Sequence, residues 1–170
     1  MDRLEIRRAA NADIPAIAHI INEAWKAGYA GIVPQQYLDA MREADKAKRL
    51  REGIARMPHM RYYVLCIDGV PAGTANLHRT QDDDLPDAAE FSFFYFLPAL
   101  WRRGYGSLLL GRLMHDAAEA GFHRLCCWVL EGNRRAVAFY ESRGLPPDGA
   151  RQTVSIGGAA LETVRCAGPL

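Results

Sequence analysis

The stretch Arg102-Arg103-Gly104-Tyr105-Gly106-Ser107 lies between an aromatic, strand-like segment and an amphipathic helix pattern. The first N–H groups of a helix have no partner inside the helix, and they carry a partial positive charge that attracts anions. Glycine lets phosphate oxygens approach these main-chain groups, because it has no Cβ atom in the way. The two arginines add charge-assisted hydrogen bonds. We therefore expect this turn to bind the phosphate groups of a cofactor.

Two common phosphate-binding motifs do not fit the turn. The dinucleotide motif G-x-G-x-x-G would need a third glycine where the chain has Leu109, and a P-loop would need a lysine after the glycines. The missing third glycine disfavours a dinucleotide-dependent oxidoreductase. A strand-to-helix turn without any ligand remains the plain alternative.

The rest of the chain predicts a single α/β domain over residues 1–170. Apolar runs and alternations bounded by turn residues predict seven strands: 4–7, 61–67, 70–78, 90–97, 124–130, 150–156 and 159–166. Apolar residues at helical spacing predict helices at 14–28, 34–57 (with a break left open), 105–120 and 133–140. This order predicts a mixed, mostly antiparallel sheet of about seven strands, with a central β-α-β crossover and flanking helices.

Composition excludes several classes of function. The net charge of +1 argues against a protein that coats nucleic acid or an anionic membrane, because both need a concentrated basic surface. The most apolar stretch, 91–101, is too short to span a bilayer and contains Pro98, and residues 1–5 lack the apolar core of a secretory signal. We expect a soluble cytoplasmic protein without nucleic-acid or membrane partners.

No metal is expected. The four cysteines fit no zinc-binding spacing, the five histidines form no HExxH pair, and the consecutive acids 82–84 cannot all converge on one ion without a dedicated loop. Cys126 and Cys127 should point to opposite faces of a strand, so they should not bind one ion together. We interpret the cysteines as small buried side chains of a reducing compartment.

A second block follows the central strand, running from Asn133 to Gly144. Asn133 is a favourable helix N-cap residue. Ala136 and Tyr140 are one helical turn apart and therefore share a face. Tyr140 alone would be an ordinary core aromatic, but beside the phosphate-binding turn it becomes a candidate functional residue.

Together these two blocks resemble the GNAT superfamily of N-acetyltransferases. The resemblance is carried by 90–98 followed by 102–109, and by 133–145, and the order of elements matches from end to end. It implies acetyl-CoA as co-substrate, with the amides of the Arg103–Ser107 turn on its pyrophosphate. It also implies that main-chain groups near Tyr95 and Phe96 pair with the pantetheine arm like an added strand. Asn133 would then lie beside that arm, and Tyr140 near the thioester sulfur.

The chain departs from the family pattern at two places. Trp101 stands where the family often has Gln or Arg, so one phosphate contact is in doubt, and Pro146-Pro147 follow where an aromatic residue is common. In the resembled family, the segment holding Trp25, Tyr29 and Tyr37 borders the acceptor pocket. These three aromatic residues are therefore candidates for acceptor binding, with core packing as the alternative.

The implied reaction is direct attack of a primary amine on the thioester. The chain has no G-x-S-x-G nucleophile motif and no cysteine in an electropositive motif. Glu90 starts the aromatic strand where this family often places a carboxylate that works through water, so Glu90 is the candidate general base and Tyr140 the candidate general acid. A sensor that binds acyl-CoA without turnover, and an O-acyl or other acyl-chain transferase, remain alternatives. The acceptor, a small molecule or a peptide, stays open, as does a homodimer formed through the C-terminal strands.

Overall fold

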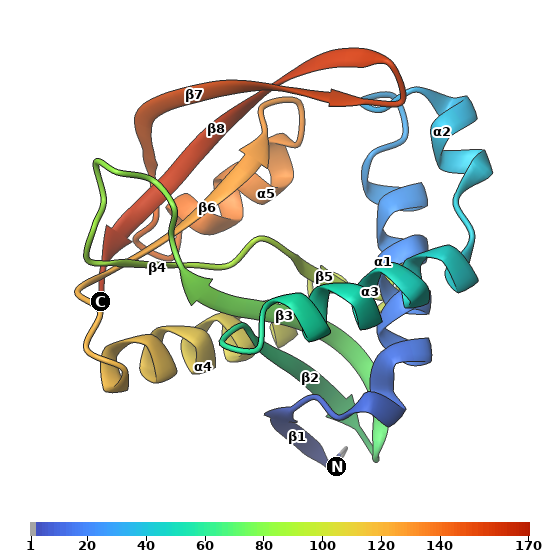
Figure 1. Cartoon of the computed structure of the whole chain (residues 1–170), viewed down its shortest axis with the longest axis horizontal. Helices are drawn as coiled ribbons and strands as arrows, with labels where there is room; N and C mark the ends of the chain where they lie inside the picture. Colours follow the sequence, from blue (N-terminus) through green and yellow to red (C-terminus); the bar gives the residue numbers. More distant parts are fainter. Residues whose placement is uncertain (1–2) are drawn as a thin grey trace.

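A computed structural model describes residues 3–170 (Figure 1). The strands are β1 (Leu4–Arg8), β2 (Arg61–Ile67), β3 (Val70–Arg79), β4 (Ala88–Glu90), β5 (Phe94–Phe96), β6 (Arg124–Leu130), β7 (Pro147–Ile156) and β8 (Ala159–Pro169). The α-helices are α1 (Ile14–Gly28), α2 (Gln35–Ala40), α3 (Glu43–Arg56), α4 (Tyr105–Glu119) and α5 (Arg134–Glu141). The strands form one sheet in the order β1-β2-β3-β4-β6-β8-β7, with β5 paired to β3. The predicted mixed α/β fold is confirmed.

The single strand predicted at 90–97 is wrong, and this error explains why the described sheet has eight strands. β4 pairs in parallel with β6, whereas β5 pairs antiparallel with β3 alone. The side-chain Oδ1 of Asn76 accepts hydrogen bonds from the main-chain N–H groups of Ser92 at 2.8 Å and Phe93 at 3.0 Å. A side chain thus satisfies two amides that a regular strand would pair with a neighbour, and the chain bends between β4 and β5. As a result, β5 and β6 diverge.

The break left open in the second predicted helix is present. α2 ends before Met41 and α3 starts after Arg42, and both of these residues have extended backbone angles. The first predicted helix agrees with α1, although its first turn, 11–13, is a 3₁₀-helix. Among the described residues, no helix has both the length and the apolar character that a bilayer crossing requires.

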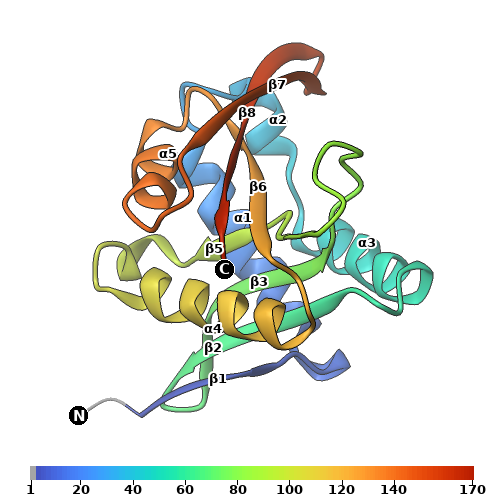
Figure 2. The same ribbon diagram turned by 90° about the vertical axis from the view of Figure 1, so that its left-hand side faces the viewer.

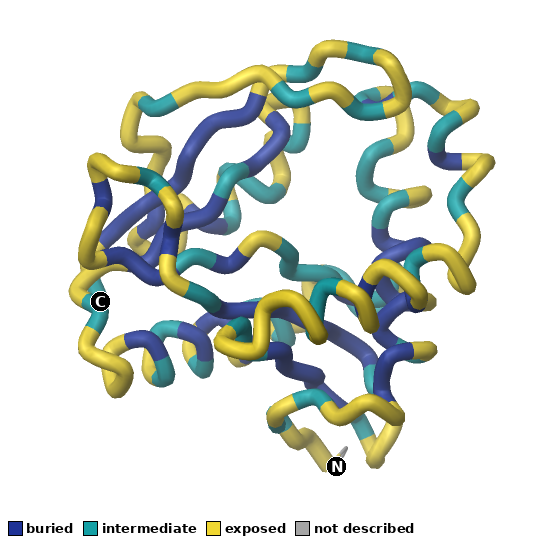
Figure 3. The backbone as a smooth tube through the Cα atoms, in the orientation of Figure 1, coloured by how far each residue is buried: buried dark blue, intermediate teal, exposed yellow. Residues whose placement is uncertain are grey.

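Two apolar cores lie on opposite faces of the sheet (Figure 2). One core packs α4 and α5 against the sheet around Leu109, Leu113 and Tyr140, and the other packs α1 and α3 around Ile17, Val64 and Leu50. The central strands are accordingly the most buried part of the chain (Figure 3). The hairpin of β7 and β8 reaches across to α2, where it encloses a smaller cluster (Figure 1).

The start of α1 is fixed by a buried carboxylate. Arg7 donates to both oxygens of Asp13, at 2.7 and 2.9 Å, and the Ala10 N–H donates to Asp13 Oδ2 at 2.7 Å. Hydrogen bonding from Arg7 lowers the pKa of Asp13 below its ordinary value of 3.8. The carboxylate therefore contributes stability that is present above about pH 4 and is lost as pH falls through the lower folded-state pKa.

We predict that Asp13→Asn lowers the free energy of unfolding at neutral pH by about 1–2 kcal/mol, because the charge-assisted bonds to Arg7 and Ala10 are lost. Urea denaturation of both proteins between pH 7 and pH 3 measures this difference. The gap should shrink as the pH falls below about 4, since the wild-type carboxyl group then takes up its proton. A gap that stayed constant over this range would show that the charge of Asp13 contributes nothing.

Candidate active site

A cavity of about 480 Å³ opens where β5 and β6 diverge. Its walls come from the segment 91–96, from β6, from the N-terminal end of α4, from α5 and from the end of α1. Because α4 and α1 pack on opposite faces of the sheet, the cavity passes through the sheet. One end of the cavity therefore lies at the Arg102–Ser107 turn, and the other end lies near α1.

Most of the residues predicted for the site line this cavity. They are Tyr29, Tyr95, Phe96, Arg102, Gly104, Gly106, Ser107, Asn133 and Tyr140. The other predicted residues are outside the lining set: Trp25, Tyr37, Glu90, Arg103 and Tyr105. Two blocks of sequence that are separated by most of α4 and by β6 thus meet at one cavity.

The Arg102–Ser107 turn has free main-chain amides, as expected. Within residues 3–170, the main-chain N–H groups from Arg102 to Gly106 donate to no main-chain or side-chain acceptor, and α4 has no side-chain cap. The amide of Ser107 is different, because it donates to the Gly104 carbonyl oxygen at 3.0 Å. Gly104 has φ of +86° and its missing Cβ would meet no atom within 4 Å, so the turn stays open to a ligand.

Arg102 has a left-handed backbone, with φ of +64°. Residues other than glycine adopt this conformation at a cost of about 1–2 kcal/mol. The strain holds an arginine at the cavity wall directly before the free amides. Strained residues concentrate at functional sites, and this one lies where an anion would bind.

The charge of the cavity wall is positive. Its charged lining residues are Arg102, Arg135 and Arg143, and the described lining contains no Asp or Glu. Arg135 lies 3.7 Å above the centre of the Trp101 ring, and Trp101 Nε1 donates to the Phe96 carbonyl oxygen at 2.9 Å. The Trp101 ring therefore makes a cation–π contact with Arg135 of α5, at a position where the family often has a polar side chain. Arg135 and Arg143 were not predicted as site residues, although both lie in the second block.

Asn133 and Tyr140 form the α5 side of the cavity. Asn133 caps α5 as predicted, with its Oδ1 accepting from the Ala136 N–H at 3.2 Å. The Tyr140 ring packs edge-on against Phe91 at 5.4 Å between ring centres. Its hydroxyl makes no hydrogen bond to any residue from 3 to 170, and burial raises the pKa of Tyr140 well above its ordinary value. The hydroxyl thus keeps its proton at neutral pH and is free to donate it inside the cavity.

Glu90 was predicted to start a strand at 90–97, but it is the last residue of β4, and it is not among the residues of the cavity wall. Its Oε2 accepts a hydrogen bond from Thr80 Oγ1 at 3.0 Å. His78 is the residue directly across from Glu90 in the β3–β4 pair. Glu90 therefore lies outside the cavity wall, two residues before Ser92, which lines the cavity.

The three aromatic candidates near α1 form one cluster, and only Tyr29 of the three lines the cavity. Trp25 packs edge-on against Tyr29 at 4.7 Å, and Tyr37 lies 6.2 Å from Trp25. The Tyr29 hydroxyl lies 3.5 Å from that of Tyr95, and burial raises the pKa of both tyrosines. Trp25 and Tyr37 thus pack together with Tyr29 but are outside the set of residues that line the cavity.

The cysteines are free and buried, as expected. Cys126 and Cys127 belong to different apolar clusters, which confirms that they point to opposite faces. Cys127 lines the cavity, but burial raises the pKa of its thiol well above the ordinary value. A thiol held in its protonated form is a poor nucleophile, so Cys127 is unsuited to forming an acyl-enzyme.

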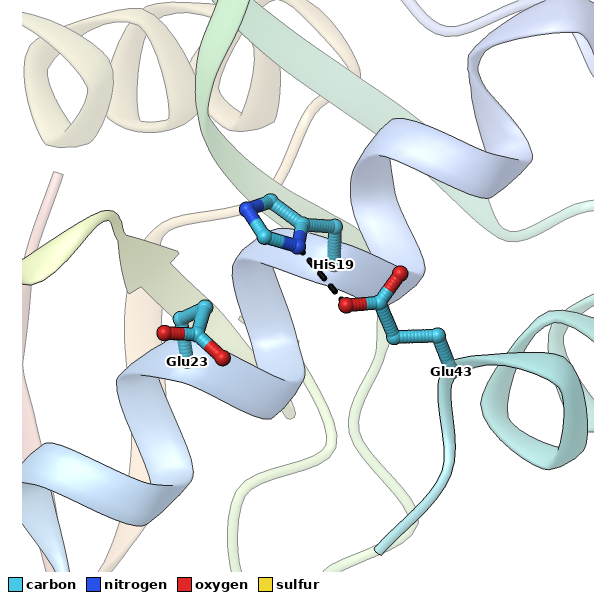
Figure 4. Close-up of side chains that lie close together, drawn as sticks. All are labelled: His19, Glu23 and Glu43. Carbon is cyan, nitrogen blue, oxygen red and sulfur yellow. Dashed lines mark hydrogen bonds and ion pairs between the residues drawn. The ribbon is translucent and has the colours of Figure 1, made fainter.

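Outside the cavity, His19, Glu23 and Glu43 bring their metal-ligand atoms within 4.8 Å of one another (Figure 4). His19 Nδ1 lies 2.7 Å from Glu43 Oε1, and this contact joins α1 to the start of α3. The side chains of His19 and Glu43 are about half exposed. We interpret the cluster as a surface contact between two helices.

The sheet therefore opens beside an uncapped helix N-terminus, at a basic and aromatic cavity. The chain belongs to the Acetyltransferase (GNAT) family, whose model matches residues 16–145. It is 27% identical over 139 residues to the uncharacterized N-acetyltransferase YjgM of Escherichia coli, covering 82% of this chain and 80% of that protein.

Two solved structures share the fold over nearly the whole chain. The PaiA N-acetyltransferase from Thermoplasma acidophilum in complex with coenzyme A has a TM-score of 0.76 at 20% identity, over 99% of both chains. YncA from Salmonella typhimurium, with its cofactor acetyl-CoA, has a TM-score of 0.74 at 26% identity, over 99% of this chain and 94% of that one. The predicted co-substrate, acetyl-CoA, agrees with the ligands of these structures.

Proposed function

We propose that this protein transfers the acetyl group of acetyl-CoA to a primary amine by direct attack. The observation that carries this proposal is the row of unpaired main-chain amides from Arg102 to Gly106 at one end of a cavity that crosses the sheet. A diphosphate bound to these amides places the rest of the cofactor along the cavity. The acyl group then reaches the side of the sheet covered by α1.

The cofactor arm would lie between β5 and β6. β5 pairs with β3 on one side only, so its other edge has main-chain groups available to the pantetheine amides. These groups belong to the segment that contains Tyr95 and Phe96, and Asn133 faces it across the cavity. Arg102 and Arg135 supply positive charge for the phosphates.

The amine must be neutral to attack the thioester carbon. A lysine-like amine has a reference pKa near 10.4, so about one molecule in a thousand is neutral near pH 7.4, a penalty of roughly 4 kcal/mol. A general base that removes this proton contributes about 10²–10⁴-fold to the rate. As the C–S bond breaks, Tyr140 donates its proton to the departing thiolate, and the acetyl group stays on nitrogen.

A panel of acceptors with acetyl-CoA tests the reaction, with release of free thiol as the readout. We expect thiol release with primary amines such as 2-phenylethylamine or a lysine peptide, and none with the matched alcohols. Release with alcohols alone would make the protein an O-acyltransferase. Binding of acetyl-CoA without any release would make it an acyl-CoA sensor.

The same proposal places the protein in the cytoplasm and allows a homodimer. Four buried free cysteines fit a reducing compartment. β7 is an edge strand of the sheet, so a second copy could pair with it. Light scattering at several protein concentrations gives the mass in solution and tests the dimer.

A further inference from the structure

The cavity wall contains no carboxylate and no imidazole among the described residues, so no lining residue of that kind can take the proton of the amine directly. The proton must therefore leave through a lining residue that can relay it. Ser92 is exposed at the cavity wall, in the bend between β4 and β5. Its hydroxyl is hydrogen-bonded to a histidine on the neighbouring strand β3.

The hydrogen bonds around this histidine define its tautomer. His78 Nδ1 lies 2.8 Å from the main-chain carbonyl oxygen of Arg79, and a carbonyl can only accept. In the neutral ring, Nδ1 therefore carries the proton and Nε2 is the acceptor. Ser92 Oγ lies 3.1 Å from Nε2, so the Ser92 hydroxyl donates to His78.

The Ser92 hydroxyl also accepts a hydrogen bond from a buried asparagine. Asn76, which is 1% exposed, donates from Nδ2 to Ser92 Oγ at 2.7 Å. The serine oxygen thus gives its proton to His78, accepts one bond from Asn76 and keeps one lone pair. That lone pair is available to an N–H group of a ligand in the cavity.

Glu90 is directly opposite His78 in the β3–β4 pair, and its carboxylate accepts a hydrogen bond from Thr80 Oγ1 at 3.0 Å. Side chains directly opposite in an antiparallel pair are about 4.5–5.5 Å apart at Cβ. A proton that arrives on His78 would produce a cation beside this negative charge. His78 is half-buried, so the ring can pass the proton on to solvent.

We propose that Ser92 and His78 form the proton relay that deprotonates the acceptor amine, with Glu90 stabilising the imidazolium. The inference rests on the proposed acetyl transfer to a primary amine, and it replaces direct or water-mediated proton removal by Glu90.

In this step an ammonium N–H proton moves to Ser92 Oγ while the Ser92 proton moves to His78 Nε2. The freed lone pair of the amine forms the N–C bond to the thioester carbon. Collapse of the tetrahedral intermediate breaks the C–S bond. The sulfur takes a proton from Tyr140, and the second nitrogen proton leaves to restore that of Tyr140. The net release is one proton per turnover, through His78.

The kinetic test uses four variants, namely Ser92→Ala, His78→Gln, their double variant and Ser92→Thr, with acetyl-CoA and the primary amine that the wild-type enzyme turns over fastest. Ser92→Ala and His78→Gln should each lower kcat by about 10²-fold, because each removes general-base catalysis. The KM for acetyl-CoA should stay within about twofold, since neither residue contacts the cofactor in this account.

The double variant should be no slower than the slower single variant, because the two residues act as one unit. Ser92→Thr should recover most of the rate, because it keeps the hydroxyl.

His115→Gln is the matched control, since it changes an exposed histidine on α4, and it should have wild-type kinetics. Wild-type rates in His78→Gln, or additive losses in the double variant, would overturn the relay. If the wild-type enzyme acetylates no amine, the proposed function fails instead.

The nitrogen NMR spectrum of the imidazole gives a readout that needs no turnover. We expect His78 to have its proton on Nδ1 in the wild-type protein, and Ser92→Ala to shift the Nε2 resonance. An Nε2-protonated ring in the wild-type protein would overturn the relay.

Discussion

Tyr140→Phe should lower kcat by about 10–10³-fold while leaving the affinity for coenzyme A within about twofold. The phenylalanine ring keeps the packing against Phe91 and Phe139, so the fold and the cavity wall remain. Only the hydroxyl is lost, and with it the proton that a departing thiolate would take. Burial raises the pKa of Tyr140, so the wild-type hydroxyl is protonated across the assay range. Steady-state kinetics and a coenzyme A titration measure the two effects separately.

Tyr62→Phe is the matched control for this substitution. Tyr62 is a buried tyrosine of β2 that packs against α1 and α3 and is not part of the cavity wall. It should retain wild-type kcat. A Tyr140→Phe enzyme at the wild-type rate would remove Tyr140 from the mechanism.

Arg165→Met should destabilise the fold by about 3 kcal/mol, because it leaves carboxylates without their counter-charge. The Arg165 side chain is 6% exposed and donates to Asp82, Asp84 and Asp148 at distances from 2.6 to 2.9 Å. These bonds tie the loop between β3 and β4 to β7 and β8. Thermal unfolding should show a Tm lower by roughly 6–12 °C for a domain of this size.

The exposed pair of Arg151 and Glu131 provides the control for Arg165. Its two side chains are about half exposed, with Arg151 Nη2 2.8 Å from Glu131 Oε1, so Arg151→Met should lower the Tm far less than Arg165→Met does. Asp84→Asn in the Arg165→Met background should restore part of the loss, because it removes one of the repelling charges. Equal Tm values for Arg165→Met and the wild-type protein would contradict a stabilising role of this network.

Local patterns predicted much of the fold. Most strand and helix ranges and the cap at Asn133 are determined by neighbouring residues, and they were predicted from them. The bend between β4 and β5 was not predicted, because it depends on Asn76, which is 16 residues away from Ser92 in the sequence. Aromatic residues at 91–96 favour one continuous strand, and the distant side chain overrides that preference.

In the candidate site too, local patterns predicted some residues, whereas others depend on contacts between distant segments. The phosphate-binding turn and Tyr140 lie in contiguous blocks, so their patterns indicate a site. His78 has no such local signal, since its partner Ser92 lies in the bend between β4 and β5. Arg135 lay in a recognised block, but only the stacking on Trp101 shows that it belongs to the cavity. Contacts between residues that are distant in the sequence form only when the sheet assembles, so local patterns do not predict them.

The central claim is that the free amides at the start of α4 bind the diphosphate of coenzyme A. An amide-resolved ¹⁵N NMR titration with coenzyme A, and separately with pantetheine, tests it most directly. We predict that the amides of Arg103, Gly104, Tyr105 and Gly106 shift on addition of coenzyme A and stay in place with pantetheine, which has no diphosphate. Saturation with coenzyme A that left these four resonances unmoved, or no binding at all, would contradict the account.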